Sequence, residues 1–240
     1  DALSDHVRHG IYGYTGRSES YLQAAVNWMG QRHGWGVDPE WILTVAGVVP
    51  TLNMAVRSFV RPGEKVLIQP PVYHPFYKSI ANNGGEIATN PLILKNGDYE
   101  IDFADLEKKA SDPAVKLAIL CSPHNPVGRI WTEAELRQFG EICQRNGIIV
   151  IADEIHGDLI MPGKHFTPYG TLGEAFAQNA IICTAASKTF NLAGLHCSNI
   201  MIPDPVKRET MATTLRSNGM GGMNPFSLIA TEVAYREGAD

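Results

Sequence analysis

A lysine and an aspartate each follow a short apolar run in this 240-residue chain. Lys188 comes just after residues 180–184, and Asp153 directly follows residues 148–152. Such runs are typical of buried strands, and open α/β sheets bind their ligands beyond the carboxyl ends of their strands. A lysine amine and a carboxylate at neighbouring strand ends are what a pyridoxal phosphate site requires. The amine forms a Schiff base, and the anion faces the pyridinium nitrogen.

Each of these residues has an ordinary explanation when it is taken alone. Most lysines are solvated surface groups, and an aspartate after a strand usually caps a turn or a helix. The separation of 188 − 153 = 35 residues, however, leaves room for one crossover between two strands. Asn125 and Pro126, ordinarily a turn signal, follow a third apolar run at residues 115–121. The combination favours a functional site.

Three segments resemble motifs of the fold-type I, aspartate-aminotransferase-like pyridoxal phosphate enzymes. They are Gly47-Val48-Val49-Pro50, Asp153-Glu154-Ile155-His156 and Ser187-Lys188-Thr189-Phe190-Asn191-Leu192-Ala193-Gly194. They occur in the family's order and span most of the chain. They are most similar to the cystathionine β-lyase (C–S lyase) and PatB/MalY-like subgroup, partly because general aminotransferases have tyrosine at the position of His156.

The resemblance implies a role for each polar group around the cofactor ring. Lys188 would hold the cofactor covalently and then remove the Cα proton of an amino acid substrate. Asp153 would stay ionised opposite the ring nitrogen, and Asn125 would donate to the phenolic oxygen. Tyr73 would stack on the ring, although an aromatic residue here could also simply cover the core. His156 is expected on the same side as Asp153.

The cofactor phosphate is expected at a strand–glycine–helix junction. Residues 41–45 are predicted to form a strand, and a helix is predicted from about residue 50 to residue 60. Free N–H groups and the helix dipole favour an anion at such a junction. The resemblance places the phosphate against Gly47 and the backbone amides of Val48 and Val49.

Two positions depart from the family's usual phosphate ligands. Many relatives have a serine at the position of Ala185 and an arginine at the position of His196. Ser187 still supplies a hydroxyl, but histidine carries a charge only part of the time near neutral pH. A weaker hold on the phosphate is expected.

The N-terminal residues 1–17 are predicted to form an interface segment ahead of a large cofactor-binding domain at residues 18–240. Tyr14 lies in the glycine-rich stretch 10–16, where it could be an aromatic staple on a loop. The resemblance implies a homodimer in which Tyr14 reaches the partner's cofactor phosphate. The family's C-terminal small domain, with the arginine that binds the substrate carboxylate, is expected to be absent from this chain.

The composition excludes several classes of partner. The net charge is −5 and charged residues make up 19% of the chain, so a nucleic-acid partner is not expected. The four cysteines show no CxxC spacing, which favours reduced thiols in a cytoplasmic protein, and no metal site is predicted. Without an apolar run of 18 residues, neither a membrane span nor a signal peptide is predicted.

The alternation of strand-like and helix-like segments predicts an α/β three-layer sandwich with a mostly parallel mixed sheet. Residues 65–68, 87–94, 115–121 and 198–202 are predicted to be further strands. The last should be antiparallel to its neighbour, because the connection from residue 182 to residue 198 is too short for a helical crossover.

The expected reaction is β-elimination from a cysteine S-conjugate, which yields a thiol, pyruvate and ammonia. A class I/II aminotransferase is the main alternative, because the cofactor residues are shared and the substrate-side groups decide. A cofactor-sensing domain of a transcriptional regulator is an alternative of another class. A degenerate binding domain is the last alternative, and Ala185 and His196 make it more credible.

Overall fold

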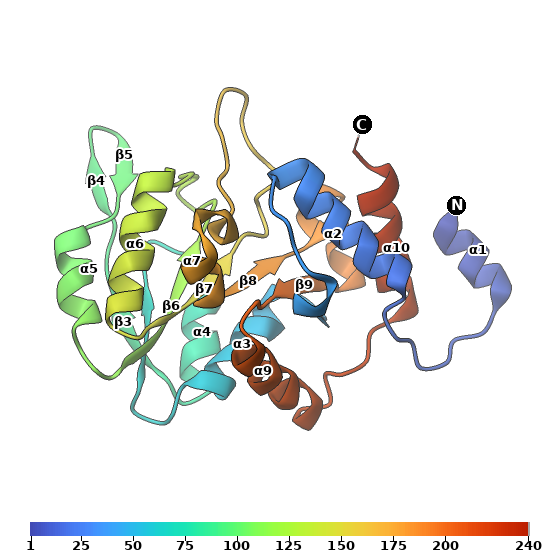
Figure 1. Ribbon diagram of the computed structural model, residues 1–240, viewed down its shortest axis with the longest axis horizontal. Coiled ribbons are helices and arrows are strands. Elements are labelled where there is room, and N and C mark those ends of the chain that lie inside the picture. The colour runs from blue at the N-terminus through green and yellow to red at the C-terminus, as the bar shows by residue number, and fades with distance from the viewer. Residues whose placement is uncertain (240) are drawn as a thin grey trace.

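Short apolar segments form a seven-stranded sheet in the computed structural model, which describes residues 1–239 (Figure 1). The strand order is β1-β9-β8-β7-β6-β2-β3, and a separate hairpin pairs β4 with β5. The strands are β1 (Ile42–Val45), β2 (Lys65–Ile68), β3 (Glu86–Thr89), β4 (Ile93–Lys95), β5 (Asp98–Glu100), β6 (Val115–Cys121), β7 (Ile149–Asp153), β8 (Ala180–Thr184) and β9 (Ser198–Met201).

The sheet is parallel except at β9, which runs antiparallel to both β1 and β8. The predicted mixed sheet and the antiparallel last strand are therefore confirmed. One edge of the sheet collects the carboxyl ends of β1, β2, β6, β7 and β8 together with the start of β9. Asp153, the last residue of β7, lies in register between Cys121 of β6 and Cys183 of β8.

Helices cover both faces of the sheet, which gives the predicted three layers (Figure 1). Helices α3, α4 and α9 pack on one face, and α2, α5, α6, α7 and α10 on the other. The helices are α1 (Ala2–His9), α2 (Glu19–His33), α3 (Val48–Phe59), α4 (Pro75–Ala81), α5 (Phe103–Ala110), α6 (Glu133–Arg145), α7 (Glu174–Gln178), α8 (Ala186–Thr189), α9 (Pro205–Ser217) and α10 (Pro225–Glu237), with short 3-10 turns at Pro39–Trp41, Tyr169–Leu172 and Ala193–Leu195.

Alternation along the central strands divides the core in two. In β7, Ile151 packs towards α3, while Val150 and Ala152 pack towards α2 and α6. The alternation continues past the end of the strand, because successive side chains of a strand point to opposite faces. Asp153 therefore lies on the α3 side and Glu154 on the α2 side.

Several helices begin at a residue whose side chain caps the first turn. Ser18 accepts a hydrogen bond from the backbone N–H of Tyr21 at the start of α2, and Asp102 accepts one from the N–H of Asp105 at the start of α5. Thr132 and Glu135 form a reciprocal capping box at the start of α6.

Three local predictions need correction. Residues 87–94 do not form one strand: β3 ends at Thr89 and β4 begins at Ile93. Helix α3 begins at Val48, two residues before the predicted start. Helix α1 was not predicted, and none of its residues is buried.

All four cysteines are buried, and within the described residues none forms a disulfide. Among residues 1–239, no helix combines the length and apolar character needed to cross a bilayer.

Candidate active site

A cavity of about 390 Å³ opens at the edge of the sheet where the parallel strands end. It is lined by nine of the ten residues predicted for the cofactor site, namely Gly47, Val48, Val49, Tyr73, Asn125, Asp153, His156, Ser187 and Lys188. These residues come from five separate connections after β1, β2, β6, β7 and β8. The shared direction of those strands brings them together.

Asp153 provides a buried carboxylate in this cavity. Its side chain is only 5% exposed, and the backbone N–H of Ile155 donates to its Oδ1 at 3.3 Å. Burial raises the pKa of Asp153 to about 6, although that hydrogen bond and the positive charge of Lys188 both act to lower it. A carboxylate held in this way favours a cationic partner in the cavity.

Lys188 lies on the single helical turn α8, which follows β8 directly. Its side chain is exposed to the cavity, and Ser187 lies next to it in the same wall. His156 is half-buried nearby, and burial, with a smaller contribution from Lys188, lowers the pKa of its imidazole. The cavity therefore combines an amine, a carboxylate and an imidazole that is neutral near pH 7.

The first turn of α3 forms the end of the cavity that suits an anion. Gly47 has φ of 117° and its N–H donates to the Val45 carbonyl, while the first helical bond runs from Thr51 N–H to the Gly47 carbonyl. The N–H groups of Val48 and Val49 therefore have no carbonyl partner within the helix. Pro50 has no N–H, so these two amides are the donors that the turn offers to a ligand.

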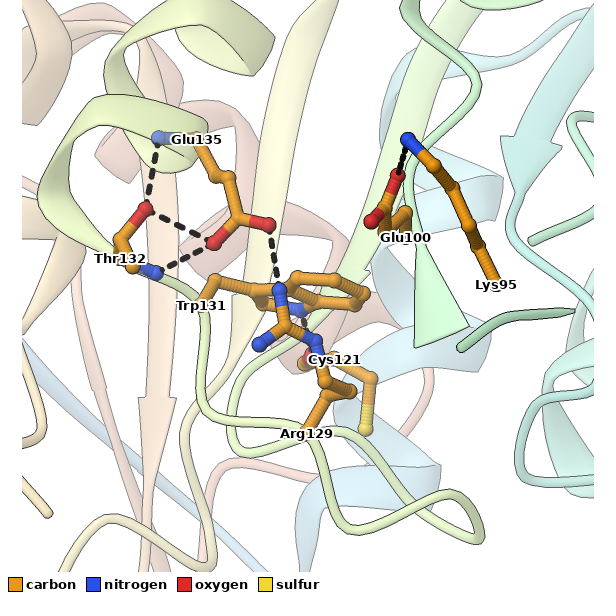
Figure 2. Close-up of polar contacts among 7 residues, drawn as sticks. All are labelled: Lys95, Glu100, Cys121, Arg129, Trp131, Thr132 and Glu135. Atoms are coloured by element: carbon orange, nitrogen blue, oxygen red, sulfur yellow. Dashed lines mark hydrogen bonds and ion pairs between the residues drawn. The ribbon is translucent and has the colours of Figure 1, made fainter. Parts of the chain in front are cut away.

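The loop that carries Asn125 is fixed by contacts further along the chain. Trp131 donates from Nε1 to the carbonyl of Cys121 at 2.9 Å. Figure 2 shows this contact. Arg129 forms an ion pair with Glu135, and its guanidinium lies 4.8 Å from the centre of the Trp131 ring. These contacts close the connection between β6 and α6, which carries Asn125.

Two further contacts hold the start of the same loop. The Asn125 N–H donates to Cys121 Sγ at 3.3 Å, and His124 Nε2 lies 3.0 Å from the carbonyl of Pro71. Burial lowers the pKa of His124 to about 4, so its ring is neutral. Because Pro71 precedes Tyr73, this contact links the Asn125 loop to the loop that carries the aromatic wall of the cavity.

Tyr73 fits both interpretations of its aromatic ring. The ring is half-buried and meets Phe76 edge to face with a centroid distance of 5.9 Å, so it covers part of the core. It also lines the cavity, where one face can receive a flat ligand.

Tyr14 is the predicted site residue that the structure does not bring to the cavity. Within the described chain, its side chain is fully exposed and lies beside the segment from Gly221 to Met223. A role for Tyr14 therefore requires a second subunit.

The cavity wall also contains residues that were not predicted as ligands. Cys197 and His196 directly precede β9, and that strand is antiparallel, so its start lies at the edge where the other strands end. His196 stands where the resemblance placed an arginine against the phosphate, whereas the signal that could have found Cys197 is the short β8–β9 connection. Cys121 is the last residue of β6 and contacts Asn125, and Ile155 lies between Asp153 and His156 in the sequence. The remaining wall residues are Ala46, Pro50 and Ala193.

Comparison with known proteins identifies the family. Residues 2–227 match the family model for aminotransferase class I and II. The chain belongs to this family. Within it, the chain is 49% identical over 238 residues to the cystathionine β-lyase PatB of Bacillus subtilis (strain 168), covering 99% of this chain and 62% of PatB.

Solved structures of pyridoxal phosphate-containing proteins superpose closely on the fold. Cystalysin from Treponema denticola, which contains pyridoxal 5′-phosphate, gives a TM-score of 0.96 at 40% identity over 99% of this chain and 60% of its own. A pyridoxal phosphate-bound protein from Clostridium difficile 630, described as a putative aminotransferase, gives a TM-score of 0.97 at 39% identity. The match covers 100% of this chain and 62% of that protein. The chain thus spans about three fifths of these proteins.

Proposed function

We propose that the protein is a pyridoxal phosphate-dependent C–S β-lyase, which cleaves a cysteine S-conjugate to a thiol, pyruvate and ammonia. The observation that carries the proposal is the meeting of Lys188, Asp153 and Asn125, from three adjacent strand ends, around one cavity. The similarity to PatB supports elimination as the outcome.

The residues of the cavity fit the groups that this cofactor carries. The Lys188 amine matches its aldehyde, and the Asp153 carboxylate, with its raised pKa, matches a basic ring nitrogen. The unpaired amides of Val48 and Val49 match a phosphate. When bound, the cofactor supplies an electron sink for negative charge that develops at the substrate Cα.

Each residue of the cavity has a separate role in the proposed reaction. Lys188 would hold the cofactor through its amine, and the free amine would serve as the base for the Cα proton. Asp153 would favour a protonated ring nitrogen, since two opposite charges in a buried site stabilise each other. Tyr73 would exclude water from the cavity, and Asn125 would supply a hydrogen-bond donor for the ring oxygen. Ser187 and His156 complete the wall on the lysine side.

A class I/II aminotransferase is the second candidate, because the family model and one close structural neighbour carry that description. Both reactions begin with removal of the same Cα proton, so the cavity residues do not distinguish them. The protein should be incubated with pyridoxal phosphate and cystathionine, and separately with an amino acid and a keto acid. Pyruvate with an equivalent of thiol supports the lyase, and amino transfer without thiol supports the aminotransferase. Neither product would defeat both.

We further propose that the protein acts as a cytoplasmic homodimer, in which Tyr14 of one subunit completes the phosphate site of the other. The fully exposed side chain of Tyr14 and the four free, buried thiols support this arrangement. The mass of the protein in solution tests the dimer, and mixed dimers, described below, test the role of Tyr14.

A further inference from the structure

A buried carboxylate outside the cavity connects the lysine turn to the opposite layer of the fold. Asp158 lies in the loop after β7 and its side chain is 8% exposed. Its Oδ2 accepts a 2.7 Å hydrogen bond from the hydroxyl of Thr189, the residue directly after Lys188. Its Oδ1 lies 2.8 Å from Nε2 of His33, at the end of α2. One side chain thus bridges three segments.

The bridge is electrostatically satisfied despite its burial. Burial alone would raise the pKa of Asp158, but the hydrogen bonds from His33 and Thr189 and the nearby charge of Arg32 lower it overall. The Arg32 guanidinium is more distant, with Nε 4.0 Å from Oδ1, and it is half exposed. Asp158 is therefore ionised at neutral pH, and the bond from the Thr189 hydroxyl is charge-assisted.

Backbone bonds from the Phe190 N–H to the Ala186 carbonyl and from the Leu192 N–H to the Ser187 carbonyl close the lysine turn, and the Thr189 hydroxyl makes its side-chain hydrogen bond to Asp158. Helix α8 is four residues long and has no side-chain cap. An isolated turn of this length is unstable, because its first hydrogen bond must order several residues. On the side of α2, Phe190 packs against Trp28 with a centroid distance of 5.4 Å. This apolar contact is non-directional, whereas the Thr189–Asp158 bond fixes the rotation of the turn.

We propose that Asp158 and Thr189 are positioning residues for Lys188: the carboxylate, held by His33, fixes the turn so that the amine faces the Asp153 end of the cavity. The inference rests on the proposed function in that Lys188 is taken as the residue that binds the cofactor. Asp158 lies five residues after Asp153 (158 − 153), so the loop that directly follows one site group orients the other.

Covalent capture by Lys188 is an intramolecular step whose equilibrium depends on how well the amine is placed. A reaction between two groups held in one site loses much of its rate and equilibrium advantage when the reacting atom is displaced by about 1 Å. A hydrogen bond to a charged partner contributes about 1.5–3 kcal/mol, which corresponds to roughly 10–150-fold in an equilibrium constant. We therefore expect loss of the Thr189 hydroxyl to weaken cofactor binding by about tenfold or more.

The test uses a matched series at residue 189. Thr189→Val removes the hydroxyl but keeps the shape, and Thr189→Ser restores the hydroxyl. Thr214→Val removes another half-buried threonine hydroxyl, which donates to the Thr210 carbonyl in α9. For each variant, the dissociation constant of pyridoxal phosphate and the fraction of residue 188 trapped by borohydride are measured. Thermal unfolding is followed separately.

The proposal expects weaker binding and less trapping in Thr189→Val, with Thr189→Ser within about twofold of the wild type and Thr214→Val unchanged. A Thr189→Val protein that is less stable but binds normally would show that the bond only supports the fold, and the proposal would fail. Equal losses in Thr189→Ser and Thr189→Val would also overturn it.

A second measurement keeps this inference separate from the proposed function. In the cofactor-free protein, an excess of an amine-acylating reagent is applied at several pH values, and labelling of Lys188 is compared with labelling of the exposed Lys78 on α4. The ratio should shift by more than about twofold in Thr189→Val and not in Thr214→Val. An unchanged ratio defeats the positioning role. A wild-type protein that binds no pyridoxal phosphate defeats the proposed function alone, and the labelling ratio then decides the positioning role by itself.

Discussion

Replacing Glu154 with glutamine should make the stability of the protein less dependent on pH. Glu154 directly follows Asp153 but points into the opposite core, where it is 4% exposed. Its Oε1 accepts a 2.6 Å hydrogen bond from the backbone N–H of Tyr169. Among the described residues its Oε2 has no hydrogen-bond partner. Burial, reinforced by the nearby Asp153, raises the pKa of Glu154 from 4.5 to about 8, although the Tyr169 N–H opposes the shift.

The direction of the effect is opposite to that of an ordinary carboxylate. An acid whose pKa is raised on folding binds its proton more tightly in the folded state, so folding is most favourable below the unfolded pKa of about 4.5. The advantage is lost as the pH rises towards about 8, at about 1.4 kcal/mol per unit. Between about pH 5 and pH 7 this group alone should therefore lower the free energy of unfolding by about 2–3 kcal/mol.

Glutamine resembles the protonated acid in shape and charge, and its amide oxygen can still accept from Tyr169. The Glu154→Gln variant should therefore match the wild type near pH 5 and exceed its free energy of unfolding by about 2–3 kcal/mol near pH 7. Asp153 also titrates in this range, with a pKa of about 6, but it does so in both proteins and largely cancels in the difference.

The assay is urea unfolding of the cofactor-free protein, followed by tryptophan fluorescence at several pH values. Glu141→Gln, at an exposed position of α6, is the control and should run parallel to the wild type. The reasoning is refuted if the difference between Glu154→Gln and the wild type stays constant from about pH 5 to pH 7. A variant that is destabilised equally at every pH would instead show that the carboxylate is ionised and needed in the fold.

Asp153→Asn should retain the cofactor but lower kcat/KM for elimination by about 10²-fold or more, because a preorganised charge is lost. Unchanged steady-state kinetics would contradict the role of Asp153. Mixing Tyr14→Phe with Lys188→Ala subunits should restore wild-type cofactor affinity in about one quarter of the sites. Half of the dimers are then mixed, and each mixed dimer has one site with both Lys188 and the partner's Tyr14. No restored sites would rule out a shared site. Gly140→Ala should lower the free energy of unfolding by about 1–3 kcal/mol in a denaturation curve, because its Cβ would lie 2.5 Å from the Tyr169 hydroxyl. Gly30→Ala, with no atom within 4 Å of its Cβ, should raise that free energy by about 0.5–1 kcal/mol. Equal effects would contradict the packing argument.

The central strands could be predicted because burial on both faces leaves an unmistakable sequence pattern. The runs at 65–68, 115–121 and 180–184 have the bounds of β2, β6 and β8. Short, mainly apolar segments between turn residues favour a buried parallel strand. The polar residues at their ends were predicted for the same reason, since a parallel sheet collects those ends at one edge.

The errors occurred where side chains far apart in sequence decide the local structure. Residues 87–94 are broken into two strands at Asn90, whose buried amide donates to the carbonyl of Asp102 and to the side chain of Asp105. Pro91 follows and cannot donate to a strand ladder. Helix α1 has no buried side chain, but His6 meets Phe226 of α10 at a centroid distance of 5.4 Å. Neither contact is visible in a local pattern.

The start of α3 shows how a correct chemical argument can misplace a boundary. Proline suits the first position of a helix, which favoured a start at Pro50. In the structure Pro50 is the third residue of α3, where its missing N–H is equally harmless. The shift places Val48 and Val49 inside the first turn, so the predicted phosphate ligands are helix amides rather than loop amides.

The two acidic residues at the end of β7 show why sequence spacing alone does not define the candidate site. Asp153 and Glu154 are adjacent and almost equally buried, yet the first lines the cavity and the second contacts Tyr169 in the core. Burial raises both pKa values, to about 6 and about 8, so Asp153 is the carboxylate that is ionised at neutral pH. The charge is thus confined to the face where Lys188 lies, and Asp158, paired on the other face, orients the lysine turn. Because strand alternation decides which acid faces the cavity, a one-residue shift in the register of β7 would place the proton-retaining acid in the site and remove its anion.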